Sequence, residues 1–215
     1  YLKNKDGFFF GSETKFIRIL VNNYKEINNK KIIQYLRYGY KSIERTNESF
    51  FRNIFKMEAG TNFIIKKDLN ILRSSYWKPQ INEKKISENI CKKLIKKNFE
   101  EKIKLICNTD LNIGLSLSGG IDSNFILSFI KKRMNKRVKT YSIIDQNSKK
   151  YNEEDLINFI TKKYNIKNKK IYLSNRKDYL PELKKLINYH DKPISTISYF
   201  LQSLIYKEMK KDNVK

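Results

Sequence analysis

The sequence has few of the residues that mark disulfide frameworks, metal centres and membrane spans. Its 215 residues include two cysteines, one histidine, three prolines and seven glycines. Cys91 and Cys107 lie in one helical stretch without a CxxC spacing, which argues against a disulfide framework or a zinc site and favours a reducing compartment. No apolar run reaches the ~18 residues of a membrane span. We therefore expect a cytoplasmic protein without membrane contact.

Acidic residues are also scarce, since 22 Asp and Glu stand against 46 Lys and Arg, a net charge of +24. Such a charge is typical of proteins that bind nucleic acid or acidic membranes. The lysines, however, are scattered singly and in pairs along the whole chain, among many Asn and Ile, as the codons of an AT-rich genome would produce. We therefore favour codon bias over a nucleic-acid surface. A hydrophobic content of 40% is enough for the cores of one or two globular domains.

The first part of the chain mixes short helices with one hairpin. We expect a helix within residues 11–23, with Ser12 as its N-cap, and another at 29–39 that Gly39 ends in a left-handed conformation. Residues 61–77 predict two strands around a turn at 68–70. A composition change near Pro79 is followed by a long amphipathic helix over residues 83–107, which we take as the entry to a second domain.

From residue 113 onward, apolar strand patterns alternate with amphipathic helix patterns. This alternation predicts βαβ units and therefore an α/β fold, a parallel sheet with flanking helices. We expect the first strand to be central in that sheet. The expected strands are 113–117, 138–144 and 170–173, and the expected helices are 121–133, 153–165, 179–190 and 197–211.

Between the first strand and the first helix of this region stands the stretch "LSLSGGIDSN", which predicts a phosphate-binding turn. Gly119 and Gly120 let the backbone approach a phosphate, and the hydroxyls of Ser118 and Ser123 add donors. A carboxylate beside phosphates repels them unless a cation lies between, so Asp122 indicates Mg²⁺. Neither the Walker A pattern nor GxGxxG can be read here.

This stretch resembles the pyrophosphate-binding PP-loop, SGGxDS, of the N-type ATP pyrophosphatases. The flanking segments resemble the glutamine-hydrolysing asparagine synthetases among them. The segments that carry this likeness are "FFFGSETKFI" (8–17), "RTNESFFRNIFKMEAGTNFIIKKDLNILRSSYW" (45–77), "NTDLNIGLSLSGGIDSN" (108–124), "TYSIIDQNSKKYNEEDL" (140–156) and "HDKPIST" (190–196).

The resemblance implies two domains. Residues 1–80 would be the carboxyl-terminal part of an Ntn-type α+β glutaminase domain, and residues 81–215 the amino-terminal part of a Rossmann-like PP-loop synthetase domain. The chain would then be an internal fragment, inactive alone. The cysteine nucleophile of the glutaminase would precede Tyr1, so no catalytic residue is assigned, and the family's S-G-x-G-x-D-E motif, with a second magnesium ligand, would follow Lys215.

The resemblance also implies the chemistry. ATP and Mg²⁺ would activate the β-carboxylate of aspartate as β-aspartyl-AMP, and ammonia from glutamine would displace AMP. Ser118, Gly119, Gly120 and Ser123 would bind pyrophosphate and Asp122 the metal. The remaining two expected ATP-binding residues, Leu117 and Ile143, correspond to positions whose backbone meets adenine, although both fit a plain strand core equally well.

Departures from the family pattern lie outside the phosphate loop: Ile144 replaces a glycine, Asn152 an aspartate and Ala59 a proline. Three alternatives stay open. A tRNA-modifying PP-loop enzyme would make the positive charge functional, and a binding module would keep the fold without turnover. A ligase similar to β-lactam synthetases or lasso-peptide cyclases would use another carboxylate. A homodimer is also left open.

Overall fold

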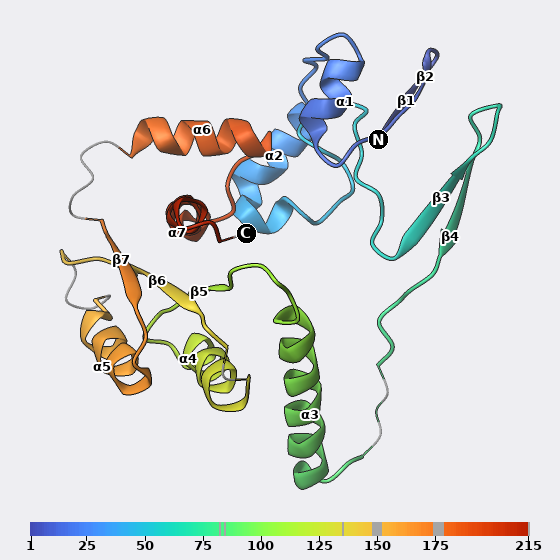
Figure 1. The fold of residues 1–215 in the computed structure, drawn as a ribbon. Helices are drawn as coiled ribbons and strands as arrows, with labels where there is room; N and C mark the ends of the chain where they lie inside the picture. Colours follow the sequence, from blue (N-terminus) through green and yellow to red (C-terminus); the bar gives the residue numbers. More distant parts are fainter. Residues whose placement is uncertain (82, 84, 135, 148–151, 174–178, 215) are drawn as a thin grey trace. The chain divides into compact units, whose positions relative to one another are not determined.

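The protein is described by a computed structural model, in which residues 1–81, 83, 85–134, 136–147, 152–173 and 179–214 are placed (Figure 1). The chain forms two compact units. The first comprises Tyr1–Glu83 and Leu180–Tyr199, and the second Lys84–Tyr179 and Phe200–Lys215. The first unit thus takes in a helix that we expected in the second domain. The assignment of residues 1–80 and 81–215 to a glutaminase and a synthetase domain stays a prediction.

The first unit holds three helices and two hairpins in its described residues. In chain order these are β1 (Leu2–Asn4), β2 (Gly7–Phe9), α1 (Thr14–Leu20), α2 (Asn29–Tyr38), the 3-10 turn η1 (Gly39–Ser42), β3 (Thr61–Ile65), β4 (Ile71–Ser75) and α6 (Leu180–His190). The expected hairpin at 61–77 is confirmed as an antiparallel β3–β4 pair. Gly39 ends α2 as expected, but as its C-cap with a φ of 61° and a ψ of −150°, which is not the left-handed helical conformation that we expected. Ser12 as the N-cap of α1 was wrong, because Glu13 holds that position and makes no side-chain cap bond.

The core of the first unit is small. Leu2, Ile17 and Ile54 are buried together, and rings of Phe9 and Phe51 pack against them. Each of the two antiparallel sheets has only two strands within the described residues. Both therefore present outer edges without a strand partner in this part of the chain.

The second unit is an α/β layer structure, which confirms the expected fold class. Its elements are α3 (Glu88–Ile106), β5 (Gly114–Ser116), α4 (Ile121–Phe129), the π turn η2 (Ile130–Met134), β6 (Lys139–Ile144), α5 (Glu154–Tyr164), β7 (Asn168–Tyr172) and α7 (Ile197–Lys211), of which the second unit takes α7 from Phe200 onward. β5 pairs in parallel with β6, and β6 in parallel with β7.

The expected central place of the first strand was wrong for the described sheet. The order is β5-β6-β7, so β6 is central and β5 lies at an edge. Just before β5, Asn112 forms an isolated parallel bridge with Val214. A strand's neighbours are set by pairing between distant segments, and a local apolar pattern does not encode that pairing.

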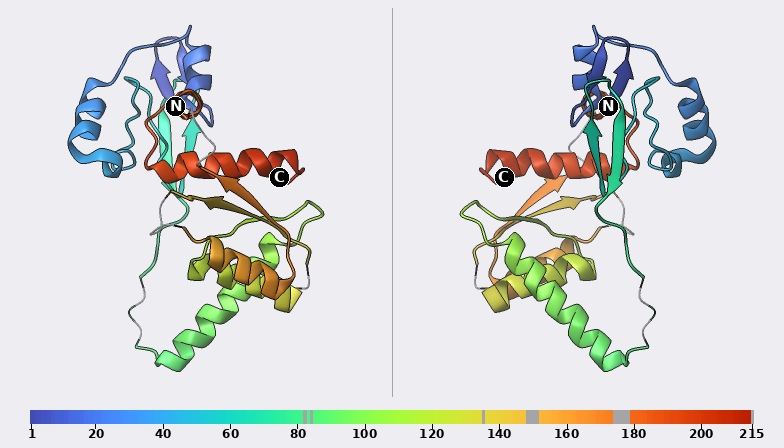
Figure 2. Two further views of the ribbon diagram at one scale, coloured as in Figure 1. Left: turned by 90° about the vertical axis from the view of Figure 1, so that its left-hand side faces the viewer. Right: turned by 90° about the vertical axis from the view of Figure 1, so that its right-hand side faces the viewer.

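Helices cover both faces of the parallel sheet (Figure 2). α4 and α5 lie on one face, where Leu117, Leu127, Ile144 and Ile157 form a buried cluster. α7 lies on the other face and buries Phe200, Leu204, Ile205 and Met209. Successive strand residues point to opposite faces. β6 can therefore serve both layers, with Ile144 on the α4–α5 side.

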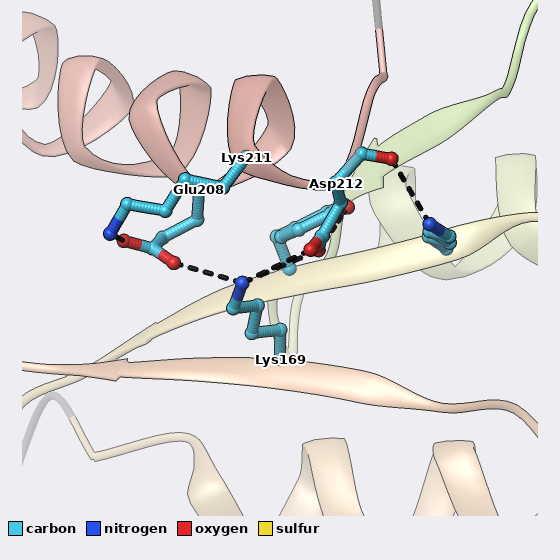
Figure 3. Close-up of polar contacts among 6 residues, drawn as sticks. Lys169, Glu208, Lys211 and Asp212 are labelled. Atoms are coloured by element: carbon cyan, nitrogen blue, oxygen red, sulfur yellow. Dashed lines mark hydrogen bonds and ion pairs between the residues drawn. The ribbon is translucent and has the colours of Figure 1, made fainter.

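A polar network joins the end of α7 to the sheet (Figure 3). Lys169 of β7 donates to Glu208 at 2.9 Å and to Asp212 at 3.3 Å. Asp212 also accepts a hydrogen bond of 2.9 Å from the hydroxyl of Tyr141, which is fully buried. Burial is the main cause that raises the pKa of Tyr141, to about 12. This network fixes α7 over β6 and β7.

The long helix α3 begins at Ser87, whose hydroxyl accepts from the N–H of Ile90, rather than at the expected residue 83.

Both cysteines are free, and burial raises the pKa of the Cys107 thiol. Phe99 of α3 lies against Phe125 of α4 with ring centroids 4.5 Å apart. Among the described residues, no helix combines the length and the apolar character needed to cross a membrane.

Candidate functional site

The turn between β5 and α4, residues 117–120, is the candidate site, and it follows the carboxyl end of a parallel strand. The N–H of Leu117 donates to the carbonyl of Tyr141 in the central strand at 2.8 Å. The backbone leaves the sheet at Ser118 and enters α4 at Ile121. In open parallel sheets, ligands bind beyond the carboxyl ends of the strands, where the next helix presents its N-terminus.

Two serine hydroxyls hold the turn closed. The Oγ atoms of Ser118 and Ser123 lie 3.0 Å apart. The N–H of Ser118 donates to Ser123 Oγ, and the N–H of Gly120 donates to Ser118 Oγ, both at 3.2 Å. Four of the expected pyrophosphate-binding residues therefore meet in one loop. Because hydroxyls rotate freely, each can turn from these N–H groups toward a ligand.

The first turn of α4 leaves backbone donors open. Its N-cap, Gly120, has no side chain to accept a hydrogen bond. The first N–H to bond a carbonyl of the turn is that of Asn124, at 3.4 Å from the oxygen of Gly120. The N–H groups of Ile121, Asp122 and Ser123 precede it and point from the helix N-terminus, as in anion sites of other proteins.

Asn124 is a site residue that we did not expect. Its Nδ2 donates to the carbonyl oxygens of Ser118 at 3.1 Å and Gly120 at 2.6 Å. These bonds turn the loop carbonyls toward α4, and an anion meets fewer lone pairs when the carbonyls face the helix. In the sequence, only its position directly after Ser123 could have indicated a role for Asn124 in the site. That position was not informative, because polar residues are common in the first turn of a helix.

Glu153 is the second residue that sequence reasoning left out, since an acidic residue in a first helical turn has an ordinary dipole role. Its Oε2 accepts a hydrogen bond of 2.8 Å from the N–H of Gly119. A Cβ on Gly119 would lie 3.0 Å from Leu156 and 3.2 Å from Glu153 Cβ. Glycine is thus needed here because the start of α5 packs directly against the loop.

The start of α5 is itself fixed to the sheet. Glu154 accepts from Lys170 at 2.8 Å and from the hydroxyl of Tyr172 at 3.0 Å. The Lys170 hydrogen bond is the main cause that lowers the pKa of Glu154. Asn152 accepts from the N–H of Glu154 at 3.0 Å, so an asparagine caps this turn where the resembled family has aspartate. Tyr151 of that segment lies outside the described residues.

Asp122 is exposed in the first turn of α4. No described residue gives its carboxylate a hydrogen bond or ion pair, so both oxygens are open to a ligand. In the placed ranges, no group of three or more His, Cys, Asp or Glu could hold a metal by itself. One free carboxylate beside a turn that is expected to bind phosphate nevertheless fits Mg²⁺, which is held by one or two carboxylates together with substrate phosphates.

Leu117 directly follows β5, and Ile143 lies in the adjacent strand β6. Leu117 is 2% exposed and belongs to the buried cluster. Its N–H donates to Tyr141, and its carbonyl accepts from Ser142 Oγ at 2.6 Å, so both backbone groups already have partners. Ile143 is half-buried. The side chain of Leu117 is core, and a backbone contact of either residue with adenine stays a prediction.

Comparisons with known proteins identify the family of this chain. Residues 94–215 match the family model described as asparagine synthase. The chain is 26% identical over 212 residues to glutamine-hydrolysing asparagine synthetase 1 of Bacillus subtilis, covering 98% of this chain and 32% of that protein. It is 27% identical over 209 residues to a Methanocaldococcus jannaschii protein provisionally named glutamine-hydrolysing asparagine synthetase 2, covering 93% and 38%.

The chain thus spans about a third of the length of these relatives. Among solved structures, the NH3-dependent NAD synthetase of Campylobacter jejuni, in complex with nitrate, covers 60% of this chain and 55% of its own. The two chains are 22% identical, with a TM-score of 0.36. The family match extends over more than half of the sequence and includes the whole SGGIDS loop, and the chain belongs to the asparagine synthase family.

Proposed function

We propose that this chain supplies the ATP-binding half-site of a ligase that makes asparagine from aspartate. The observation that carries the proposal is the loop of residues 118–123, a glycine turn with two hydroxyls, an open helix N-terminus and an unpaired carboxylate. Such a loop binds phosphate oxygens through backbone N–H groups and needs a cation beside its carboxylate. Family membership supports the choice of ATP and aspartate.

In this proposal, the loop residues bind the β- and γ-phosphates that leave as pyrophosphate. The N–H groups of Gly119 and Gly120 and the hydroxyls of Ser118 and Ser123 donate to the oxygens, because each can exchange its present internal acceptor for a phosphate oxygen. The positive end of α4 favours the negative charge that grows on the leaving group. The backbone of Leu117 and Ile143 contacts adenine, as the family resemblance implies.

Asp122 holds Mg²⁺ against the same phosphates. When bound, the ion neutralises charge on the departing pyrophosphate, as metals do in phosphoryl and nucleotidyl transfer. Asp122 would contribute one carboxylate ligand to the ion from the first turn of α4. The β-carboxylate of aspartate then attacks the α-phosphorus, forming β-aspartyl-AMP and releasing pyrophosphate.

Ammonia completes the reaction by displacing AMP from β-aspartyl-AMP. We propose that it comes from glutamine, and that residues 1–80 belong to the domain that hydrolyses glutamine. Support comes from the two relatives, both named as glutamine-hydrolysing and both aligned over nearly all of this chain. The two hairpins with unpaired outer edges in the placed residues agree with part of a larger β-rich domain. The proposed location is the cytoplasm.

The proposal is tested by exchange of labelled pyrophosphate into ATP in the natural protein, with ammonia supplied so that glutamine hydrolysis is not needed. Exchange should require aspartate. Asp122→Asn should keep the fold, since the two side chains have nearly the same shape, and should slow exchange by about 10² because an amide gives the cation no negative charge. Exchange at the wild-type rate in Asp122→Asn would exclude the metal role, and exchange without aspartate would exclude this acceptor.

A further inference from the structure

The three N–H groups at the centre of the loop all have acceptors within the protein, and one acceptor differs from the others. Ser118 and Gly120 donate to serine hydroxyls, which are neutral and can rotate away. Gly119 instead donates to the carboxylate of Glu153, 34 positions further along the chain, at 2.8 Å. A carboxylate oxygen on a backbone N–H is a charge-assisted hydrogen bond, about twice as strong as a neutral one.

This carboxylate accepts from an N–H that the proposed site would offer to a phosphate oxygen. A single backbone N–H cannot donate a good hydrogen bond to two anionic oxygens at once, and the two negative charges would repel each other at this distance. Among the described residues, none forms an ion pair with Glu153, and the N–H of Gly119 is its hydrogen-bond donor. The remainder of its side chain faces solvent, which leaves it room to swing out.

The backbone under Glu153 holds the carboxylate at the loop. Glu153 precedes α5, and the N–H of Ile157 bonds to its carbonyl at 3.0 Å. The next residue, Glu154, is tied to Lys170 and Tyr172 of β7. The carboxylate can therefore leave Gly119 by a side-chain rotation, while the helix stays in place.

We propose that Glu153 is a specificity residue of this site, an internal anion that competes with free polyphosphate for Gly119 and so favours polyphosphate complexed with a divalent cation. The proposal rests on the proposed pyrophosphate site. A bare anion must displace Glu153 and then tolerate its charge together with that of Asp122. A metal complex carries less negative charge and meets weaker repulsion from both carboxylates.

The test measures the affinity of the 215-residue chain for pyrophosphate by calorimetry, with EDTA and with excess Mg²⁺. Glu153→Gln removes the charge but keeps the shape. It should bind metal-free pyrophosphate about tenfold more tightly than the wild type, since one charge-assisted hydrogen bond no longer competes. The gain should be about twofold or less for the magnesium complex. Equal or weaker metal-free binding by Glu153→Gln would overturn the proposal.

Two further variants separate the contact from the charge. Asp155→Asn removes the same charge from an exposed position in the same helical turn, and its metal-free affinity should stay within about twofold of the wild type. Glu153→Asp keeps the charge but shortens the side chain by one methylene, which draws the carboxylate back from Gly119. Its affinity for metal-free pyrophosphate should therefore rise, but by less than that of Glu153→Gln. Two results would show that Glu153 does not compete for Gly119. One is an increase in metal-free affinity in Asp155→Asn as large as that in Glu153→Gln, and the other is no increase in Glu153→Asp.

The bond between Gly119 and Glu153 can also be followed without a ligand. The amide resonance of Gly119 should move, and its hydrogen exchange should quicken, in Glu153→Gln but not in Asp155→Asn.

The two proposals fail in different ways. If the wild type and every variant bind pyrophosphate equally, Glu153 has no such role while the pyrophosphate site stands. If none binds pyrophosphate in either condition, the pyrophosphate site itself is wrong, and the role of Glu153 falls with it.

Discussion

The hydroxyl of Ser142 donates a hydrogen bond of 2.6 Å to the carbonyl oxygen of Leu117, so the central strand holds the residue that joins β5 to the candidate loop. Ser142 is fully buried, and its Oγ also accepts from Asn168 Nδ2 at 2.9 Å. One hydroxyl therefore links β5, β6 and β7 directly beneath the site. Its loss would leave a buried carbonyl and a buried amide each short of a partner.

Ser142→Ala should accordingly destabilise the protein by about 1–3 kcal/mol, the cost of leaving buried polar groups unpaired. The value is checked by chemical denaturation, which gives the free energy of unfolding of the second unit, where Ser142 lies. Ser128→Ala is the matched control, because its hydroxyl bonds only to the carbonyl of Phe125 within the same helix. The control should change the stability by less than about 0.5 kcal/mol. Equal effects in the two variants would contradict the proposed role of Ser142.

The two loop glycines should differ in what an added methyl group costs. Gly119→Ala would place a Cβ 3.0 Å from the end of the Leu156 side chain and 3.2 Å from the Cβ of Glu153, so these neighbours must give way by a few tenths of an ångström. We expect a loss of at least about 1 kcal/mol from this overpacking. In Gly120→Ala the new atom meets only the hydroxyl of Ser118, at 3.2 Å, and the loss should be smaller. Thermal unfolding of both variants measures the difference, and a larger loss at Gly120 would refute the packing argument.

The Tyr141–Asp212 hydrogen bond should give stability a defined pH window. Burial and this bond raise the pKa of Tyr141 to about 12, so its contribution is complete below the ordinary value of 10.0 and is lost as pH rises toward 12. The same bond is the main cause that lowers the pKa of Asp212, whose contribution is present above its ordinary value of 3.8 and is lost as pH falls below it.

Tyr141→Phe should therefore be less stable than the wild type near neutral pH, and the difference should shrink at both ends of the range. The measurement is the free energy of unfolding of both proteins at pH values from acid to alkaline. Phenylalanine fills the buried site and lacks only the hydroxyl, so packing changes little. If the difference in the free energy of unfolding stays constant or widens toward high pH, the folded protein does not raise the pKa of Tyr141, and the account of this hydrogen bond is wrong.

Local patterns predicted most of the second unit, because its elements are short and strongly periodic. The predicted strand 138–144 is observed as Lys139–Ile144, and the predicted helix 153–165 as Glu154–Tyr164. The helix predicted at 121–133 is α-helical only to Phe129 and continues as a π turn. The edge position of β5 could not be predicted, because the bond partners of a strand lie far away in the sequence.

The same distinction applies to the candidate site. The residues of the loop were predictable because glycine, hydroxyl and carboxylate groups stand next to each other in "SGGIDS". Glu153 and Asn124 were not, because their roles depend on the atoms that they reach. Glu153 bonds to Gly119 only because α5 packs against the loop, and no local pattern distinguishes it from an ordinary first-turn acid. Ser142 is likewise a small strand residue until its partners in β5 and β7 are known.

Binding of a magnesium–pyrophosphate group by residues 118–123, through Asp122, can be measured on the chain itself. Its most direct measurement is a titration of the chain with pyrophosphate, with and without Mg²⁺, followed through the amide resonances of Ser118, Gly119, Gly120 and Ser123. Asp110→Asn, an exposed carboxylate outside the loop, is the control.

In the wild type and in Asp110→Asn, we predict that Mg²⁺ strengthens binding by about tenfold or more and that these four amides move together to saturation. In Asp122→Asn, the same amides should move, but Mg²⁺ should add little. Saturating shifts elsewhere in the chain with these four unmoved, or an equal effect of Mg²⁺ in Asp122→Asn and the wild type, would contradict the account.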